Sequence, residues 1–142
     1  PRNGNRKKKR SEMILIFGGA YQGKTEYAVK NFNIDRTQDC SRGERPDFSA
    51  DCICGIEGFV SDCVKKGVEA KSYFQEHREE WNSPRGEAEE KIFVITDTSQ
   101  GVVPVDPDVR AAREMNGRLM IYLAEEAREV HRVFCGIGKR IK

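Results

Sequence analysis

The stretch that decides the fold is Gly18-Gly19-Ala20-Tyr21-Gln22-Gly23-Lys24-Thr25, which has the spacing G-x-x-x-x-G-K-[ST]. It follows the apolar run 13–17 and precedes residues 26–32, which are expected to continue as a helix. A glycine loop between a strand and a helix allows successive backbone N–H groups to surround a phosphate at the positive end of that helix. The stretch therefore predicts a phosphate-binding loop, or P-loop.

The residue types of this loop suggest individual roles. Lys24 is expected to reach the outer phosphates of ATP or GTP and to neutralise charge as a phosphoryl group leaves, which makes it a candidate catalytic residue. The Thr25 hydroxyl is expected to ligate Mg²⁺. The nucleotide is expected to contact the rest of the loop as well, namely Gly18, Gly19, Ala20, Tyr21, Gln22 and Gly23.

Apolar patterns in the rest of the chain predict alternating strands and helices. The near-continuous apolar run 91–96 is typical of a strand covered on both faces of a parallel sheet. Further strands are predicted at 49–54 and 130–135, and helices at 56–66, at 68–81 with a break at 83–86, and from Asp106 onward. Residues 33–48 and 97–105 are interpreted as loops, and 136–142 as a closing turn with a basic tail. The alternation predicts an α/β P-loop nucleotide-binding fold, a mostly parallel sheet flanked by helices, in one domain over 13–142.

The helix from Asp106 has the clearest signals. Asp106 at the cap, Pro107 at the first helical position and Asp108 in the first turn suit the unpaired N–H groups there. The apolar residues that follow recur at helical spacing. They are expected to form the buried face of the helix: Ala112, Met115, Leu119, Tyr122, Leu123 and Ala127.

Two aspartates are candidates to complete the phosphate site. Ligands of parallel sheets bind at the carboxyl ends of the strands, so acids there are expected to lie near the glycine loop. Asp51, in the predicted strand 49–54, is expected to hold Mg²⁺ together with Thr25 and to be a catalytic residue, although it could be an ordinary aspartate at the start of a strand. Asp97, just after the run 91–96, is expected to lie near the nucleotide.

Composition favours one soluble domain. The 142 residues are 37% hydrophobic and 34% charged. No apolar run approaches the roughly 20 residues of a membrane span and no signal peptide is recognised, so a cytoplasmic protein without a membrane partner is expected. Residues 1–12 carry six lysines and arginines against Glu12 and are interpreted as a basic disordered leader. A solvated tail is favoured over a nucleic-acid contact.

The cysteines and histidines do not suggest a metal centre. The five cysteines, an odd number, are expected to be free thiols. Four of them, Cys40, Cys52, Cys54 and Cys63, lie close in sequence but lack the paired C-x2-C spacing of a zinc site, so buried or incidental thiols are favoured over zinc. His77 and His131 lie near no nucleophile or cysteine pair, and surface or packing roles are expected for both.

Several motifs resemble those of the bifunctional adenosylcobinamide kinase/adenosylcobinamide-phosphate guanylyltransferase family of cobalamin biosynthesis. The glycine loop is similar to that family's G-G-A-R-S-G-K-S loop, and residues 50–52 resemble its V-D-C segment. The region 92–142 resembles a family pattern G-I-V-P…R-x-F-R-D-x-x-G-R…A-D-E-V…G-I-P. The matching residues are Gly101, Val102, Val103, Pro104, Arg110, Arg113, Glu114, Gly117, Arg118, Ala124, Ala127, Glu129, Val130, Gly136 and Ile137.

The resemblance implies a transferase of adenosylcobalamin biosynthesis that uses ATP or GTP with Mg²⁺, takes a corrinoid as acceptor and assembles as a homotrimer. The family's second strand, and its histidine that accepts GMP, would fall between the first helix and residues 50–52, where this chain has only a polar stretch without histidine. Guanylyl transfer through histidine is therefore in question, whereas phosphate and metal binding are expected to remain. A nucleotide-binding relative without turnover, another small-molecule P-loop kinase and a nucleic-acid-associated NTPase are the alternatives.

Overall fold

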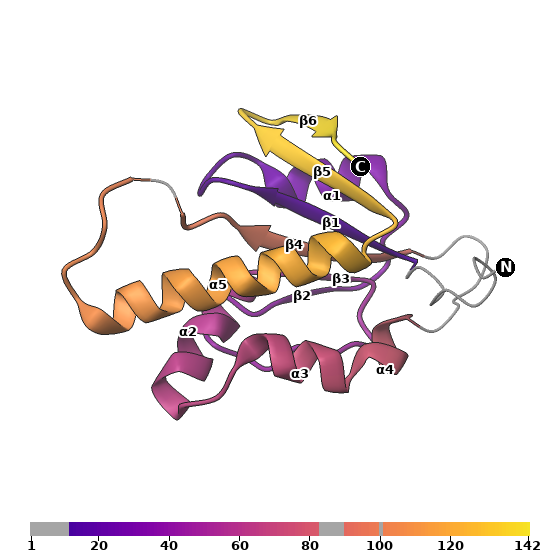
Figure 1. Cartoon of the computed structure of the whole chain (residues 1–142). Helices are drawn as coiled ribbons and strands as arrows, with labels where there is room; N and C mark the ends of the chain where they lie inside the picture. Colours follow the sequence, from indigo (N-terminus) through magenta and orange to yellow (C-terminus); the bar gives the residue numbers. More distant parts are fainter. Residues whose placement is uncertain (1–11, 83–89, 100) are drawn as a thin grey trace, which may run out of the picture.

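The computed structural model describes residues 12–82, 90–99 and 101–142. Figure 1 shows the elements in chain order along the colour bar. They are β1 (Met13–Gly18), α1 (Lys24–Asn31), β2 (Thr37–Asp39), β3 (Cys52–Cys54), α2 (Ile56–Lys66), α3 (Ala70–Glu76), α4 (Arg78–Asn82), β4 (Lys91–Thr96), α5 (Pro107–Glu126), β5 (Glu129–Phe134) and β6 (Ile137–Arg140). Residues 1–11 of the expected leader and the expected break at 83–86 lie outside the described residues.

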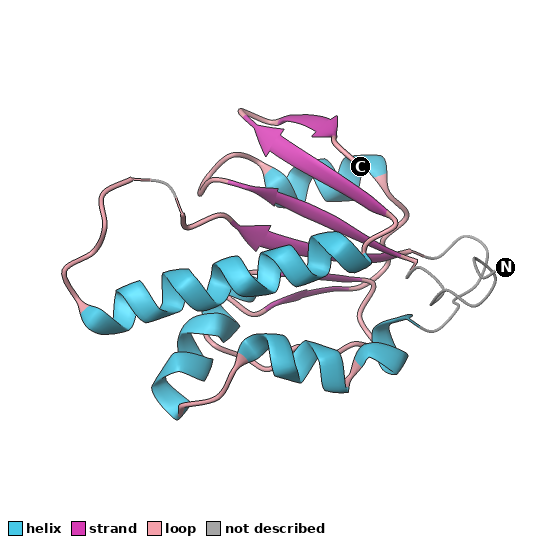
Figure 2. Ribbon diagram, viewed as in Figure 1, coloured by secondary structure: helices cyan, strands magenta, loops and turns pink. Residues whose placement is uncertain are grey.

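The strands form one six-stranded sheet in the order β2-β3-β4-β1-β5-β6. All neighbouring pairs are parallel except β5 and β6, which are antiparallel. Helix α1 covers one face of the sheet, whereas α2, α3 and α5 cover the other (Figure 2). The prediction of an α/β protein with a mostly parallel sheet flanked by helices is confirmed.

The two faces of the central strand β1 explain why this architecture forms. Side chains alternate across a strand, so Ile14 and Ile16 pack with Ala28 of α1, while Met13 and Leu15 join the larger cluster beneath α2, α3 and α5. All four β1 side chains are essentially inaccessible to solvent. A strand that is apolar on both faces is stable only between two helical layers, which is the arrangement observed.

Three segments differ from the sequence predictions. The polar stretch 33–48 contains the edge strand β2, the tail 136–142 contains β6, and the predicted helix 68–81 is two helices that meet at His77. The predicted strand 49–54 is limited to the three residues of β3. Edge strands need no continuous apolar pattern because one side of their hydrogen-bonding ladder faces solvent, which is why β2 and β6 were missed.

Helix α5 begins as predicted. The Asp106 carboxylate accepts hydrogen bonds from the N–H groups of Asp108 (2.8 Å) and Val109 (3.4 Å), and Pro107 is the first helical residue. Met115, Leu119, Tyr122, Leu123 and Ala127 are buried, whereas Ala112 is only half-buried. The helix therefore packs its apolar face against the sheet and its neighbours α2 and α3.

Candidate nucleotide-binding site

The glycine loop, residues 18–25, lies at the carboxyl end of β1, in the middle of the sheet. Gly18 is paired with Thr96 of β4 and with Val133 of β5, so the loop leaves the sheet between the ends of two parallel neighbours. The N–H of Asp97 donates to the Gly18 carbonyl oxygen at 2.8 Å. In Figure 1 the arrowheads of β1, β4 and β5 all point toward this edge. The loop thus occupies the position at which ligands enter parallel sheets.

Two glycines of the loop are required by close backbone contacts. A Cβ atom on Gly18 would lie 2.4 Å from the Val133 carbonyl oxygen, a distance that no side chain tolerates. Gly23 has a φ of 84° immediately before α1 begins, and a Cβ there would lie 3.3 Å from the Gly136 Cα. The left-handed conformation favours glycine because it has no Cβ. These contacts place the N-terminus of α1 at the loop, where its unpaired N–H groups favour an anion.

Lys24 is a buried cation at the loop. Lys24 is only 9% exposed, and its Nζ donates to the Gly19 carbonyl oxygen at 2.7 Å. Burial lowers the pKa of Lys24, and the nearby carboxylates of Glu57 and Glu26 oppose that change. The ammonium group therefore contacts the backbone of the glycine loop itself.

The side of the loop toward β5 and β6 is fixed by Gln22. Its Oε1 accepts from the Cys135 N–H at 2.6 Å, and its backbone carbonyl accepts from the Gly136 N–H at 2.8 Å. Gln22 is expected from the sequence to contact the nucleotide as part of the loop, and in the structure its side chain binds the β5–β6 turn. Tyr21 has a φ of 59° and a fully exposed side chain, which leaves its ring available at the outer rim.

Thr25 lies at the start of α1 and shares a side-chain hydrogen bond with Cys54, the last residue of β3. Burial raises the pKa of the Cys54 thiol, and the carboxylate of Asp39, at the end of β2, raises it further. The Thr25 hydroxyl thus faces the carboxyl ends of the neighbouring strands. This is the position expected for a Mg²⁺ ligand next to a phosphate loop.

Besides Asp39 at the end of β2, the carboxylates of Asp97 and Glu57 lie at this edge of the sheet. Asp97 follows β4, and its Oδ1 accepts from the N–H and the hydroxyl of Ser99 at 2.9 and 2.6 Å. Glu57, in the first turn of α2, accepts from the Thr96 N–H at 2.9 Å through Oε1. Sequence reasoning found Asp97 and missed Glu57, although the position of Glu57 in the first helical turn after a strand was a usable signal. Mg²⁺ prefers oxygen ligands and is often bound by one or two carboxylates plus phosphates, so Thr25 with these acids fits that ion.

Asp51 does not lie at this edge. It precedes β3, whose first residue Cys52 pairs with Ile92 near the start of β4, so Asp51 lies at the amino ends of the parallel strands. Its Oδ2 accepts from the N–H groups of Asp35 and Arg36 at 2.9 and 3.0 Å. The structure therefore corrects the expected grouping: Asp51 binds the backbone that leads into β2, and it is not brought to Thr25.

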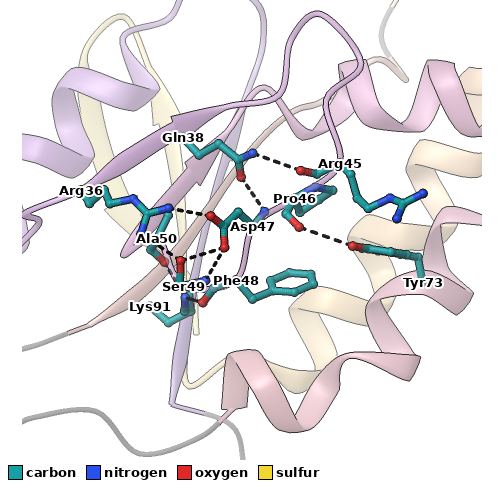
Figure 3. A network of polar contacts seen from close by, with 10 residues as sticks. All are labelled: Arg36, Gln38, Arg45, Pro46, Asp47, Phe48, Ser49, Ala50, Tyr73 and Lys91. Carbon is teal, nitrogen blue, oxygen red and sulfur yellow. Dashed lines mark hydrogen bonds and ion pairs between the residues drawn. The ribbon is translucent and has the colours of Figure 1, made fainter.

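The surroundings of Asp51 form a polar network that fixes residues 45–50 (Figure 3). Arg36 pairs with Asp47 at 2.6 Å, and Asp47 also accepts from the Ser49 hydroxyl. Lys91, the buried first residue of β4, donates through Nζ to the carbonyl oxygens of Phe48 and Ala50. Because every one of these groups has a partner within the network, the amino ends of the strands have a structural role.

Neither histidine lies at the glycine loop. His77 stacks on Tyr73 with ring centroids 4.2 Å apart and contacts Phe48, which belongs to the amino-end network. His131 is 7% exposed, and its ring nitrogens lie 2.9 Å from the Tyr27 hydroxyl and from Glu129 Oε1. Both positions agree with the expected packing roles.

The cysteines form no metal-binding cluster within the described residues. Cys40, Cys52 and Cys63 are buried, and burial raises the pKa of the first two to about 12 and of Cys63 to about 11. Within the described ranges, no three His, Cys, Asp or Glu side chains are grouped so that they could hold a metal ion.

Among these same residues, no helix is both long and apolar enough to cross a bilayer.

The chain matches no protein-family model and no curated protein. The function is therefore argued from the site itself.

Proposed function

We propose that this protein binds a nucleoside triphosphate with Mg²⁺ at the glycine loop and transfers its terminal phosphoryl group to a small-molecule acceptor. One observation carries the proposal: the buried ammonium group of Lys24 lies over a glycine loop that joins a central parallel strand to a helix N-terminus. Backbone N–H groups, a helix dipole and a fixed cation together provide the charge that a triphosphate needs.

Each residue has a defined task in this proposal. The backbone of residues 18–23 and the N-terminus of α1 hold the phosphates, and Lys24 balances the charge that develops on the transferred group. Mg²⁺, when bound, would supply further neutralisation of the phosphate oxygens. Thr25 with Asp97 and Glu57 would hold the ion, directly or through water, because these oxygen donors lie at the carboxyl ends of the strands.

The acceptor proposed is adenosylcobinamide, as the resemblance in the C-terminal region implies. Structural support comes from two of the resembling residues, Arg110 and Arg113, which bind the loop that follows β4. Arg110 donates to the carbonyl oxygens of Pro104 and Val105 at 3.0 and 2.6 Å, and Arg113 donates to Ser99, Gly101 and Val102. The two arginines thereby hold the loop that follows Asp97 against α5. That loop begins at the carboxyl end of β4, the edge of the sheet at which β1 leads into the glycine loop, and this supports the proposal.

Turnover tests the proposal directly. The protein is incubated with adenosylcobinamide, Mg²⁺ and either ATP or GTP, and the products are separated by chromatography and mass spectrometry. Phosphorylated corrinoid with equimolar ADP or GDP is expected, and Lys24→Ala should abolish it. Lys30→Ala, an exposed lysine on the same helix, is the matched control and should retain activity. If the native protein binds nucleotide but forms no phosphorylated corrinoid, the proposed acceptor is rejected. If the native protein binds no nucleotide, the proposed site is rejected.

A further inference from the structure

A cavity of about 430 Å³ lies between α2 and α3, and no residue of the glycine loop lines it. Helix α2 ends at Gly67, whose φ of 70° turns the chain toward α3 (Figure 1). Phe59, Asp62 and Lys66 line the cavity from α2, Tyr73 and Glu76 from α3, and Arg45 from the loop that follows β2. The volume lies within the range of about 300–1,000 Å³ that is typical of small-molecule sites.

Most of the charged side chains in the lining already have a partner of opposite charge. Asp62 Oδ2 lies 2.9 Å from Lys66 Nζ, one turn further along α2, and Glu69 pairs with an arginine of α5 at 3.1 Å. The remaining charges are those of Arg45 and Glu76, both of which are exposed to solvent. Within the described part of the chain, neither side chain has an ion pair or a hydrogen bond. The cavity therefore offers one guanidinium and one carboxylate to a ligand.

These two charges lie beside the same aromatic wall. The guanidinium carbon of Arg45 lies 5.8 Å from the centre of the Tyr73 ring, and Figure 3 shows the two side chains next to each other. The Tyr73 ring packs in turn against Phe59, with ring centroids 5.1 Å apart. Glu76 follows Tyr73 by three positions in α3, so its side chain starts one turn further along the same face of the helix.

The chemistry of the lining favours a ligand that has both charges and an apolar group. A carboxylate matches the guanidinium of Arg45, which can donate two parallel hydrogen bonds to it, and an ammonium group matches the Glu76 carboxylate. A ligand with only a negative charge would leave Glu76 unpaired and would be repelled by it, and one with only a positive charge would meet Arg45 in the same way. An apolar side chain would cover Phe59, Tyr73 and Val68.

We infer that this cavity binds a free amino acid with an apolar side chain, its carboxylate on Arg45 and its ammonium group on Glu76. The observation that carries the inference is a cavity whose two unpaired, opposite charges lie beside one aromatic wall. The site is separate from the proposed nucleotide site, since Lys24, Thr25 and Asp97 do not line the cavity.

A titration in the absence of nucleotide tests the site. L-Phenylalanine and L-leucine are added separately to the ¹⁵N-labelled protein, and the NMR signals of the backbone amides of Tyr73, Cys63 and Val68 are followed. These signals are expected to shift in a saturable way with both amino acids. If neither amino acid causes saturable shifts, or if the shifts occur only elsewhere in the chain, the inference is wrong.

Two analogues of phenylalanine test the requirement for both charges. 2-Phenylethylamine lacks the carboxylate and 3-phenylpropionate lacks the ammonium group. Each should bind at least about fivefold more weakly than phenylalanine, because one charge pair at the partly exposed site is lost. Glycine, which keeps both charges but lacks an apolar side chain, should also bind at least about fivefold more weakly. Equal affinity for phenylalanine and both analogues would contradict the inference.

Variants assign each charge to its partner. In Arg45→Gln, phenylalanine should lose its advantage over 2-phenylethylamine, whereas in Glu76→Gln it should lose its advantage over 3-phenylpropionate. A general disturbance of α3 would not produce this selective pattern. Arg42→Gln changes an exposed arginine of the same loop that does not line the cavity, so it is the matched control and should keep the native affinities. Equal effects of Arg42→Gln and Arg45→Gln would overturn the assignment of Arg45.

Discussion

Lys24 is the residue on which nucleotide binding should depend most. Lys24→Ala removes a charge-assisted contact worth about 1.5–3 kcal/mol, so affinity for ATP or GTP should fall at least about tenfold. Isothermal titration calorimetry measures the change, with Lys30→Ala as the control on the exposed side of α1. An unchanged dissociation constant for Lys24→Ala would show that the glycine loop does not bind the triphosphate.

Magnesium dependence should follow the carboxylates at the carboxyl ends of the strands. Asp97→Asn and Glu57→Gln keep the shape of each side chain but remove its charge, so Mg²⁺ should strengthen nucleotide binding less in these variants than in the native protein. Asp51→Asn should keep the native Mg²⁺ dependence and instead lower the free energy of unfolding, because Asp51 accepts from two backbone N–H groups. Loss of Mg²⁺ dependence in Asp51→Asn would return Asp51 to the site.

Residue-scale prediction from the sequence succeeded where the position followed from a local pattern. The motif spacing placed Lys24 and Thr25 at the start of a helix, and Asp97 followed a strand whose end was clear from its apolar run. The grouping of Asp51 with Thr25 was wrong because β3 begins at Cys52, three residues later than the predicted strand 49–54, so Asp51 precedes the strand and lies at the opposite end of the sheet. The strand boundary decides at which edge of the sheet a residue lies, and therefore whether it can reach a metal ion bound there.

At the scale of elements, β5 contains an acid-sensitive contact. His131 Nε2 lies 2.9 Å from Glu129 Oε1, and this hydrogen bond holds the pKa of Glu129 below its usual value, with help from Arg140 and Arg128. A carboxylate with a lowered pKa stabilises the fold above its unfolded pKa, and that stabilisation is lost as the pH falls through the folded pKa.

Glu129→Gln should therefore be less stable than the native protein near neutral pH, and the difference should shrink as the pH falls below about 4. Urea denaturation at a series of pH values measures it. Glu125→Gln is the comparison, since Glu125 is an acid of α5 for which no ion pair is observed among the described residues. A difference that stays constant with pH would mean that Glu129 contributes through packing rather than charge.

The elements themselves were predictable to the degree that they are buried. The central strands β1 and β4 are covered on both faces and have continuous apolar sequences, and α5 has both a cap and a periodic face. The edge strands β2 and β6 were predicted as loop and tail because their residues are largely polar and exposed. Neither face of these strands is buried, so their sequences have no apolar pattern. Their pairing is set by tertiary context, which no local pattern contains.

For the whole molecule, the positions of the two histidines bear on guanylyl transfer. Formation of a covalent histidine–GMP bond requires a ring nitrogen in line with the α-phosphate. His77 contacts the network at the amino ends of the strands, and His131 is buried between Tyr27 and Glu129. Incubation with labelled GTP and Mg²⁺ should therefore leave no acid-labile, base-stable label on the protein, although nucleotide binds reversibly. Stoichiometric GMP on either histidine, located by mass spectrometry, would contradict this.

The bond between Gln22 and the Cys135 N–H spans 113 positions of the chain. Ribosomes release a polypeptide from its N-terminus, so the glycine loop is synthesised early but acquires this support only after the β5–β6 turn has emerged. The Val133 carbonyl that faces Gly18 arrives equally late. A nascent chain that stops short of residue 133 would carry the complete loop motif and still lack the backbone against which the loop is shaped. Nucleotide binding at the proposed site would then depend on residues 133–136 having been synthesised, more than 100 positions after the loop itself.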